Sequence, residues 1–290
     1  MRKVAPGVAW IVIGASFFGL ACNRTAAPVK PEPVQPEAKA GQAQPAQSQP
    51  PQAPVKPAPA QPEGQPAPPA GALRWQIPAS LEAERASYQA EVTRALSEVS
   101  RFYEAVGFEM YPRNMIDSVV LFEKSSDARD YFTRTLGAPP DALPDTFAGT
   151  VDGRTLYLVS RDAYRDIWKR LYPDWPWTDG TYRGLIVHEL AHRAHEAVAI
   201  SNLGSADAMG PPWFFEGLAM YCAGQFEEKR PPMTRDEILK LVKAPSGPPD
   251  SYPLYAGLVR SLAAEFQLKD LILRASEPGF PESLWPPSGK

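Results

Sequence analysis

A long stretch without aromatic side chains decides which part of this 290-residue chain can fold. No Phe, Trp or Tyr occurs between Phe18 and Trp75, and 14 of the 34 prolines lie in residues 28–70. A segment with so little to bury cannot offset the entropy lost on ordering, so we expect residues 22–72 to form a disordered tether rich in Pro, Ala and Gln. The remaining residues, 73–290, are numerous enough for one domain with a sizeable core.

The first 21 residues have the features of a secretory signal peptide. Basic residues at the start precede a mostly apolar run over residues 8–21, which is shorter than the roughly 20 residues that a membrane-spanning helix needs. Gly19-Leu20-Ala21-Cys22 resembles a bacterial lipobox, in which the Cys is lipidated and becomes the mature N-terminus, although ordinary cleavage after Ala21 also fits. We therefore expect a protein of the bacterial cell envelope, anchored through Cys22 at a periplasmic or outer-membrane face.

The two cysteines do not predict a disulfide. Cys22 lies at the root of the tether and is expected to carry the lipid, whereas Cys222 falls within a helical apolar pattern. For Cys222, a small buried apolar residue is a better interpretation than a catalytic thiol. We therefore expect a monomeric domain that depends on its core and a bound metal, without a covalent crosslink.

The charge distribution argues against a nucleic-acid partner. Residues 1–72 carry six basic and three acidic side chains, and because the whole chain has a net charge of −3, residues 73–290 carry −6. No cluster of Lys and Arg interrupts the mixed-sign pattern of this part. Nucleic-acid-binding domains usually present a basic face, so we expect no nucleic-acid partner.

Hydrophobic spacing predicts both helices and strands in the first part of the domain. Apolar residues recur at helical spacing over residues 80–106, and Gly107 is placed to end that helix. Asp152-Gly153, between two apolar runs, is the strongest hairpin signal in the chain and predicts a two-strand ribbon. The expected elements are a strand over residues 116–122, a helix over 128–136 capped by residues 125–127, and hairpin strands over 147–151 and 155–160.

The second part of the domain predicts helices alone. They are expected over residues 181–199, 212–223, 235–242 and 254–276, with a polar loop over 201–210 and a break near Lys269. This order of elements predicts an α+β domain with a small N-terminal sheet lobe and a helical C-terminal lobe.

All three histidines of the chain lie within eight residues, at positions 188, 192 and 195. On a helix that turns about 100° per residue, His188 and His192 are about 40° apart and one turn along, so both imidazoles can point at one ion. Glu189 lies about 100° round from His188, beside such an ion, where it can accept a proton from bound water. Two histidines on an apolar face are costly to bury without partners, so a metal site explains them better than a surface helix does.

A catalytic zinc ion needs three protein ligands and leaves a fourth position for water. His195 is two helical turns from His188, about 10 Å along the axis, which is too far to share the ion. Glu216 is the only acid in an otherwise apolar stretch over residues 213–220, and an acid there is costly to bury unless it is paired or bound to a cation. We therefore predict a Zn²⁺ site formed by His188, His192 and Glu216.

The motif His188-Glu189-Leu190-Ala191-His192, followed by Trp213-Phe214-Phe215-Glu216-Gly217-Leu218-Ala219, resembles the gluzincins, or peptidase MA-like zinc metalloproteases. The resemblance covers about residues 116–276. It implies a zincin-like fold, zinc bound by the three predicted ligands, and Glu189 as the general base in hydrolysis of a peptide or protein substrate.

The resemblance also raises the question of the groups around the metal site. Thermolysin-type enzymes carry an acid four residues after the glutamate ligand that orients a histidine, but this chain has Met220 there; Asp179 and Asp207 are candidates for that role. The resemblance further implies that a tyrosine opening a late helix stabilises the oxyanion. Tyr252 is the first candidate and Tyr255, one turn later, is the second.

On this interpretation zinc activates a water molecule, Glu189 transfers its proton to the leaving amine, and the hairpin pairs with an extended peptide. Two alternatives remain open. The first is a non-catalytic envelope lipoprotein with a structural metal, although structural zinc usually has four protein ligands and a fourth is not evident. The second is a zinc hydrolase that acts on an amide of cell-wall material, which the composition does not separate from proteolysis.

Overall fold

The computed structural model describes residues 72–227, 232–244 and 251–285. The expected signal peptide, the expected lipid site at Cys22 and nearly all of the expected tether lie outside the described residues. The described part is a mixed α and β structure, as predicted, in which one small sheet precedes a series of helices. None of its helices combines the length and the apolar character that crossing a bilayer requires.

One four-stranded sheet has the order β1-β2-β4-β3, with β1 (Arg74–Gln76), β2 (Ser118–Phe122), β3 (Gly149–Asp152) and β4 (Thr155–Val159). The predicted hairpin is confirmed: Asp152 pairs with Thr155, and Gly153 in the connecting turn has a φ of 55°. The hairpin is not an isolated ribbon, because β4 also pairs in parallel with β2, and β2 with β1. Parallel pairing joins segments far apart in the sequence, and β1 has only three residues, so local patterns predicted neither feature.

The helices of the first part follow the prediction with shifted ends. The predicted helix over residues 80–106 consists of a 3₁₀ turn, η1 (Ala79–Glu84), and α1 (Arg85–Val106), and Gly107 ends it with a φ of 96°. Helix α2 (Ser125–Thr135) begins three residues earlier than predicted, because Asp127 accepts a hydrogen bond from the Lys124 N–H and belongs to the first turn. A short 3₁₀ helix, η2 (Pro112–Asn114), precedes β2.

Helix α3 (Arg161–Leu171) was not predicted. The Ser160 hydroxyl caps it by accepting a hydrogen bond from the Ala163 N–H at 3.2 Å. Its buried residues Tyr164, Ile167 and Trp168 follow a helical spacing, so both a cap signal and a periodic signal were present in the sequence.

The second part of the chain is helical, as predicted. Helix α4 (Thr181–Leu203) continues four residues beyond its predicted end, into the expected polar loop, and stops at Gly204, whose φ is 80°. The predicted break near Lys269 occurs at Phe266 and Gln267. The remaining elements are η3 (Ala206–Met209), α5 (Pro212–Cys222), α6 (Arg235–Val242), α7 (Tyr252–Glu265), α8 (Leu268–Arg274) and η4 (Glu282–Leu284).

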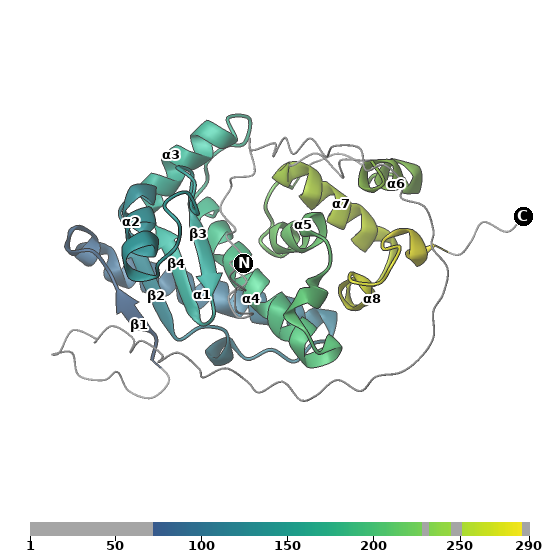
Figure 1. Ribbon diagram of the computed structural model, residues 1–290, viewed down its shortest axis with the longest axis horizontal. Helices are drawn as coiled ribbons and strands as arrows, with labels where there is room; N and C mark the ends of the chain where they lie inside the picture. The colour runs from purple at the N-terminus through teal and green to yellow at the C-terminus, as the bar shows by residue number, and fades with distance from the viewer. Residues whose placement is uncertain (1–71, 228–231, 245–250, 286–290) are drawn as a thin grey trace, which may run out of the picture. The chain divides into compact units, whose positions relative to one another are not determined.

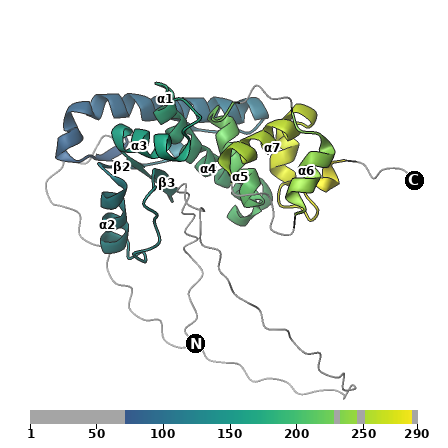
Figure 2. The ribbon, with the colours of Figure 1, turned by 90° about the horizontal axis from the view of Figure 1, so that it is seen from above.

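Helix α4 lies between the sheet and the helices α5 and α7 (Figures 1 and 2). It contacts α1, α3, β3 and β4 as well as α5 and α8, so residues 184–192 are buried without interruption. The Tyr103 hydroxyl of α1 donates to the Ala191 carbonyl at 3.1 Å, and the Tyr182 hydroxyl donates to the Val159 carbonyl of β4 at 2.8 Å. A helix whose central turns are buried and held by two buried hydrogen bonds is a rigid support for a functional site.

Candidate metal centre

The side chains of His188 and His192 converge on one point beside α4. Both imidazoles are buried, and their Nε2 atoms are 3.0 Å apart because four residues bring the second side chain one turn above the first. Two nitrogen lone pairs this close need a proton or a cation between them.

Helix α5 brings Glu216 to the same point. Its Oε2 atom lies 3.3 Å from Nε2 of His188 and 3.5 Å from Nε2 of His192, and the residue is only 8% exposed. Ligand atoms bound at 2.0–2.1 Å in a tetrahedron are about 3.3–3.4 Å apart, close to all three distances. Oε2 has no hydrogen-bond partner among the described residues, so this buried group could hold a metal ion.

The charge states of the three groups suit metal binding. Burial alone would raise the pKa of Glu216, but the neighbouring imidazoles lower that pKa to about 2, so the carboxylate is ionised at neutral pH. Burial lowers the pKa of His192 and favours its neutral form. Burial also acts to lower the pKa of His188, but Glu216 and Glu189 outweigh it and the pKa is raised. At His188, more than at the other two groups, a proton therefore competes with a metal ion for the ligand atom.

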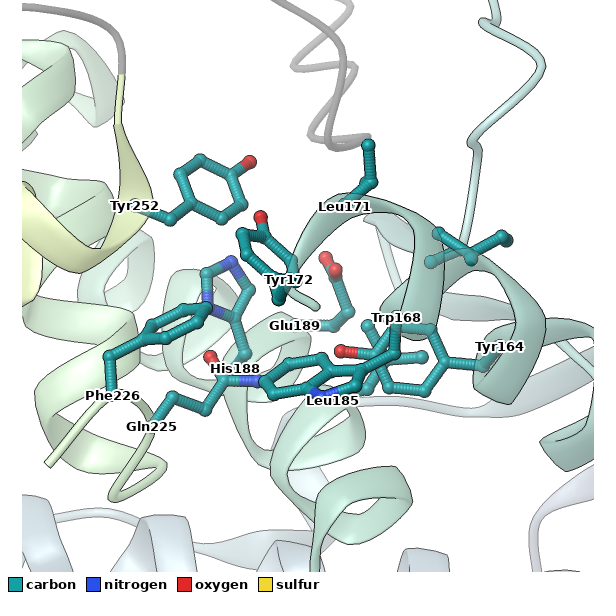
Figure 3. A pocket seen from close by; sticks show the side chains of 12 residues that line it. Tyr164, Trp168, Leu171, Tyr172, Leu185, His188, Glu189, Gln225, Phe226 and Tyr252 are labelled. Carbon is teal, nitrogen blue, oxygen red and sulfur yellow. The ribbon is translucent and has the colours of Figure 1, made fainter. Parts of the chain in front are cut away.

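Glu189 stands beside this group and not within it. Its carboxylate points into the pocket that His188 also lines (Figure 3), its Oε2 has no hydrogen-bond partner among the described residues, and burial raises its pKa to about 8. Strand β3 approaches so closely that a β-carbon on Gly149 would lie 3.2 Å from Cγ of Glu189. The position suits a group that exchanges a proton with something bound in the pocket.

Of the two tyrosine candidates, Tyr252 lines this pocket. It is the first residue of α7, and its ring centroid lies 5.9 Å from that of His188 (Figure 3). Tyr255 is 7% exposed, and its backbone carbonyl packs against Gly217 of α5. The geometry therefore places Tyr252 at the pocket, whereas Tyr255 belongs to the contact between two helices.

Several residues considered at the sequence level lie outside the group. His195 is 1% exposed and packs against Phe214, and both of its ring nitrogens lack hydrogen-bond partners among the described residues. Asp179 and Asp207 are exposed and are not hydrogen-bond partners of Nδ1 in His188 or His192, so these two candidates do not orient those rings. Cys222, expected to be buried, is partly exposed at the end of α5, and burial of its thiol raises the pKa well above its ordinary value.

Sequence patterns missed the aromatic wall of the pocket and one amide. Tyr164 and Trp168 come from α3, while Tyr172 and Phe226 come from irregular segments that no local pattern connects to the histidines. Gln225 also lines the pocket, and no signal in the sequence marked it. Figure 3 shows these side chains around His188 and Glu189.

Comparison with protein-family models, with curated proteins and with solved structures found no match for this chain. Its function therefore has to be inferred from the geometry and chemistry of the site.

Proposed function

We propose that this protein is a zinc-dependent hydrolase of peptide bonds with a zincin-like arrangement of its active-site helix. The proposal is supported above all by the convergence of His188, His192 and Glu216, whose ligand atoms lie 3.0–3.5 Å from one another. Two imidazoles and a carboxylate are a donor set found in catalytic zinc sites, where three protein ligands leave a position for water. Within the described residues the group has these three members.

A zinc ion held by such ligands lowers the pKa of a bound water to about 7 and polarises a carbonyl oxygen. Glu189 is placed to accept a proton at its carboxylate and to pass it to the leaving amine. Its Oε2 has no hydrogen-bond partner among the described residues, so that atom is available for this exchange.

One further residue, Tyr252, and one strand, β3, have binding roles in this proposal. The Tyr252 hydroxyl donates a hydrogen bond to the oxyanion that develops on the substrate carbonyl. Strand β3 lies at the edge of the sheet and approaches Glu189 through Gly149, so an extended peptide that pairs with β3 would pass beside the proposed base.

The decisive experiment replaces Glu189 with Gln, which keeps the size of the side chain and removes its basicity. We expect zinc content to stay at one ion per chain while hydrolysis of an unfolded protein substrate falls by about 10²–10⁴-fold. Undiminished, chelator-sensitive hydrolysis would exclude Glu189 as the base. Cleavage of cell-wall fragments without cleavage of proteins would mean that the same mechanism acts on an amide of cell-wall material and not on peptide bonds of proteins.

Location at the cell envelope is a separate proposal, which rests on the signal-like segment and Cys22. Replacing Cys22 with Ser should release the protein from the membrane fraction. Membrane partition equal to that of the unmodified chain would count against a lipid on this residue.

A further inference from the structure

The second ring nitrogen of His188 needs a partner if this imidazole binds a metal through Nε2. Metal-bound histidines almost always donate their other N–H to a carboxylate, carbonyl or water, which fixes the ring orientation and raises the basicity of the ligand. Nδ1 of His188 is buried, and none of the residues that the structure describes offers it a hydrogen bond of good geometry. Met220 is apolar, and the exposed Asp179 and Asp207 do not supply one either.

Gln225 occupies the right place to act as that partner. It lines the pocket together with His188, and Figure 3 shows its amide group next to the His188 side chain. A β-carbon built on Gly184 would lie 3.5 Å from Cγ and 3.6 Å from Nε2 of Gln225. Since Gly184 precedes His188 by one helical turn on the same face of α4, the Gln225 side chain runs along α4 toward the imidazole.

An unusual turn holds Gln225 there. The chain leaves α5 through Gly224, whose φ is 61°, and the Gln225 N–H donates to the Met220 carbonyl at 3.0 Å. Phe226 then has a φ of 54°, and it is the only residue other than glycine with a positive φ in the described part of the chain. A bulky side chain seldom adopts this conformation unless its surroundings impose it, so the turn is overdetermined by tertiary contacts.

Those contacts come from the aromatic wall of the pocket. The Phe226 ring is stacked on Trp168 at a centroid distance of 5.4 Å and meets Tyr172 and Trp175 edge-on at 4.9 and 5.1 Å. Its carbonyl accepts a hydrogen bond from the Arg260 side chain of α7 at 3.1 Å. The ring cluster and the arginine therefore keep the backbone on one side of Gln225 in place.

We infer that Gln225 is a positioning residue that orients the His188 imidazole for metal binding by accepting a hydrogen bond from its Nδ1–H. The inference rests on the metal site of the proposed function, but it does not depend on which bond the protein cleaves. The amide of Gln225 then does what an acid four residues after Glu216 would otherwise do. The strained conformation of Phe226 serves to hold Gln225 in this place.

The test measures the dissociation constant of Zn²⁺ for the full chain by competition with a chromophoric chelator, after removal of bound metal. Gln225→Met removes the acceptor at nearly constant volume, Gln225→Glu retains an acceptor, and Gln267→Met changes an exposed glutamine as a matched control. We expect Gln225→Met to weaken zinc binding about 10–100-fold, whereas Gln225→Glu and Gln267→Met stay within about threefold of the unmodified chain. Thermal unfolding of the metal-free Gln225→Met and Gln225→Glu chains should give similar midpoints.

Two results would overturn the inference while leaving the metal site intact. The first is unchanged zinc affinity in Gln225→Met, and the second is an equal loss in Gln225→Met and Gln225→Glu, which would mean that Gln225 only fills space. If the unmodified chain bound no zinc, the proposed metal site would fail together with the inference.

Discussion

Gly217 of α5 packs directly on the backbone carbonyl of Tyr255 in α7: a β-carbon on Gly217 would lie 2.5 Å from that oxygen. Glu216 is the neighbouring residue, so this close contact lies one position along α5 from the carboxylate that faces the two histidines. The same contact fixes the start of α7, from which Tyr252 reaches the pocket. One small residue therefore links the proposed third ligand to the proposed oxyanion donor.

Replacing Gly217 with Ala should force α5 away from α7, because the carbonyl oxygen is backbone and cannot move aside. We expect a loss of about 1–3 kcal/mol in the free energy of unfolding, or about 2–4 °C in Tm for each kcal/mol, together with weaker zinc binding. Gly257→Ala is the matched control, since the added methyl group there meets the flexible end of Met233 at 3.1 Å. Equal stability of the Gly217 variant and the unmodified chain would refute the close contact.

A methyl group on Gly149 should disturb the proposed base without touching the metal ligands. It would lie 3.0 Å from Cδ2 of Leu158 and 3.2 Å from Cγ of Glu189. We expect Gly149→Ala to retain its zinc while hydrolysis falls by up to about 10²-fold, since displacing a catalytic group by about 1 Å is costly. Gly180→Ala, where the nearest atom lies 3.7 Å away, provides the control. Loss of zinc from the Gly149 variant would contradict this separation of roles.

The two tyrosines of α7 can be told apart by removing one hydroxyl at a time. We expect Tyr252→Phe to lower kcat by about 10²-fold or more, which is the effect of removing an oxyanion donor, and to change zinc affinity little. Tyr255→Phe should leave turnover nearly unchanged, because Tyr255 does not line the pocket. The reverse pattern, with Tyr255→Phe inactive and Tyr252→Phe active, would exchange the two assignments.

His195 should make the folded chain sensitive to acid without contributing to the metal site. Burial, and then the neighbouring His192, lower its pKa from 6.5 to about 3. Between these pH values the unfolded chain binds a proton that the folded chain does not. Stability is therefore fully present above pH 6.5 and declines as the pH falls, by up to about 1.4 kcal/mol per pH unit.

The prediction is tested with His195→Leu, which removes two unpartnered buried nitrogens. Urea unfolding of the metal-free chains at pH 7 and pH 5 should show that the unmodified chain loses about 2 kcal/mol more than the variant over this interval. Comparing the two chains cancels the titration of Glu216 and Glu189. Equal pH dependence of stability in both chains would exclude His195 as the source of the acid sensitivity. Zinc binding of the variant at pH 7 should be unchanged.

Local patterns were sufficient for the features that depend on neighbours along the chain. His188 and His192 face one point because a helix brings residues four apart onto one side, and Asp152-Gly153 forms a hairpin because the turn requires a residue that tolerates positive φ. An unaccompanied acid in an apolar helix was enough to select Glu216. These inferences need only backbone geometry and the cost of burying charge.

Packing between distant segments decided the rest. The parallel pairing of β2 with β4 and the position of Tyr252, but not Tyr255, at the pocket both depend on which surfaces meet. The sequence of one segment does not show which other segment packs against it. The approach of Gln225 to His188 depends on a Phe226 conformation that is unfavourable by itself and persists only within an aromatic cluster built from α3 and the segment after it. Local propensity disfavours that turn, so only the assembled tertiary structure can specify it.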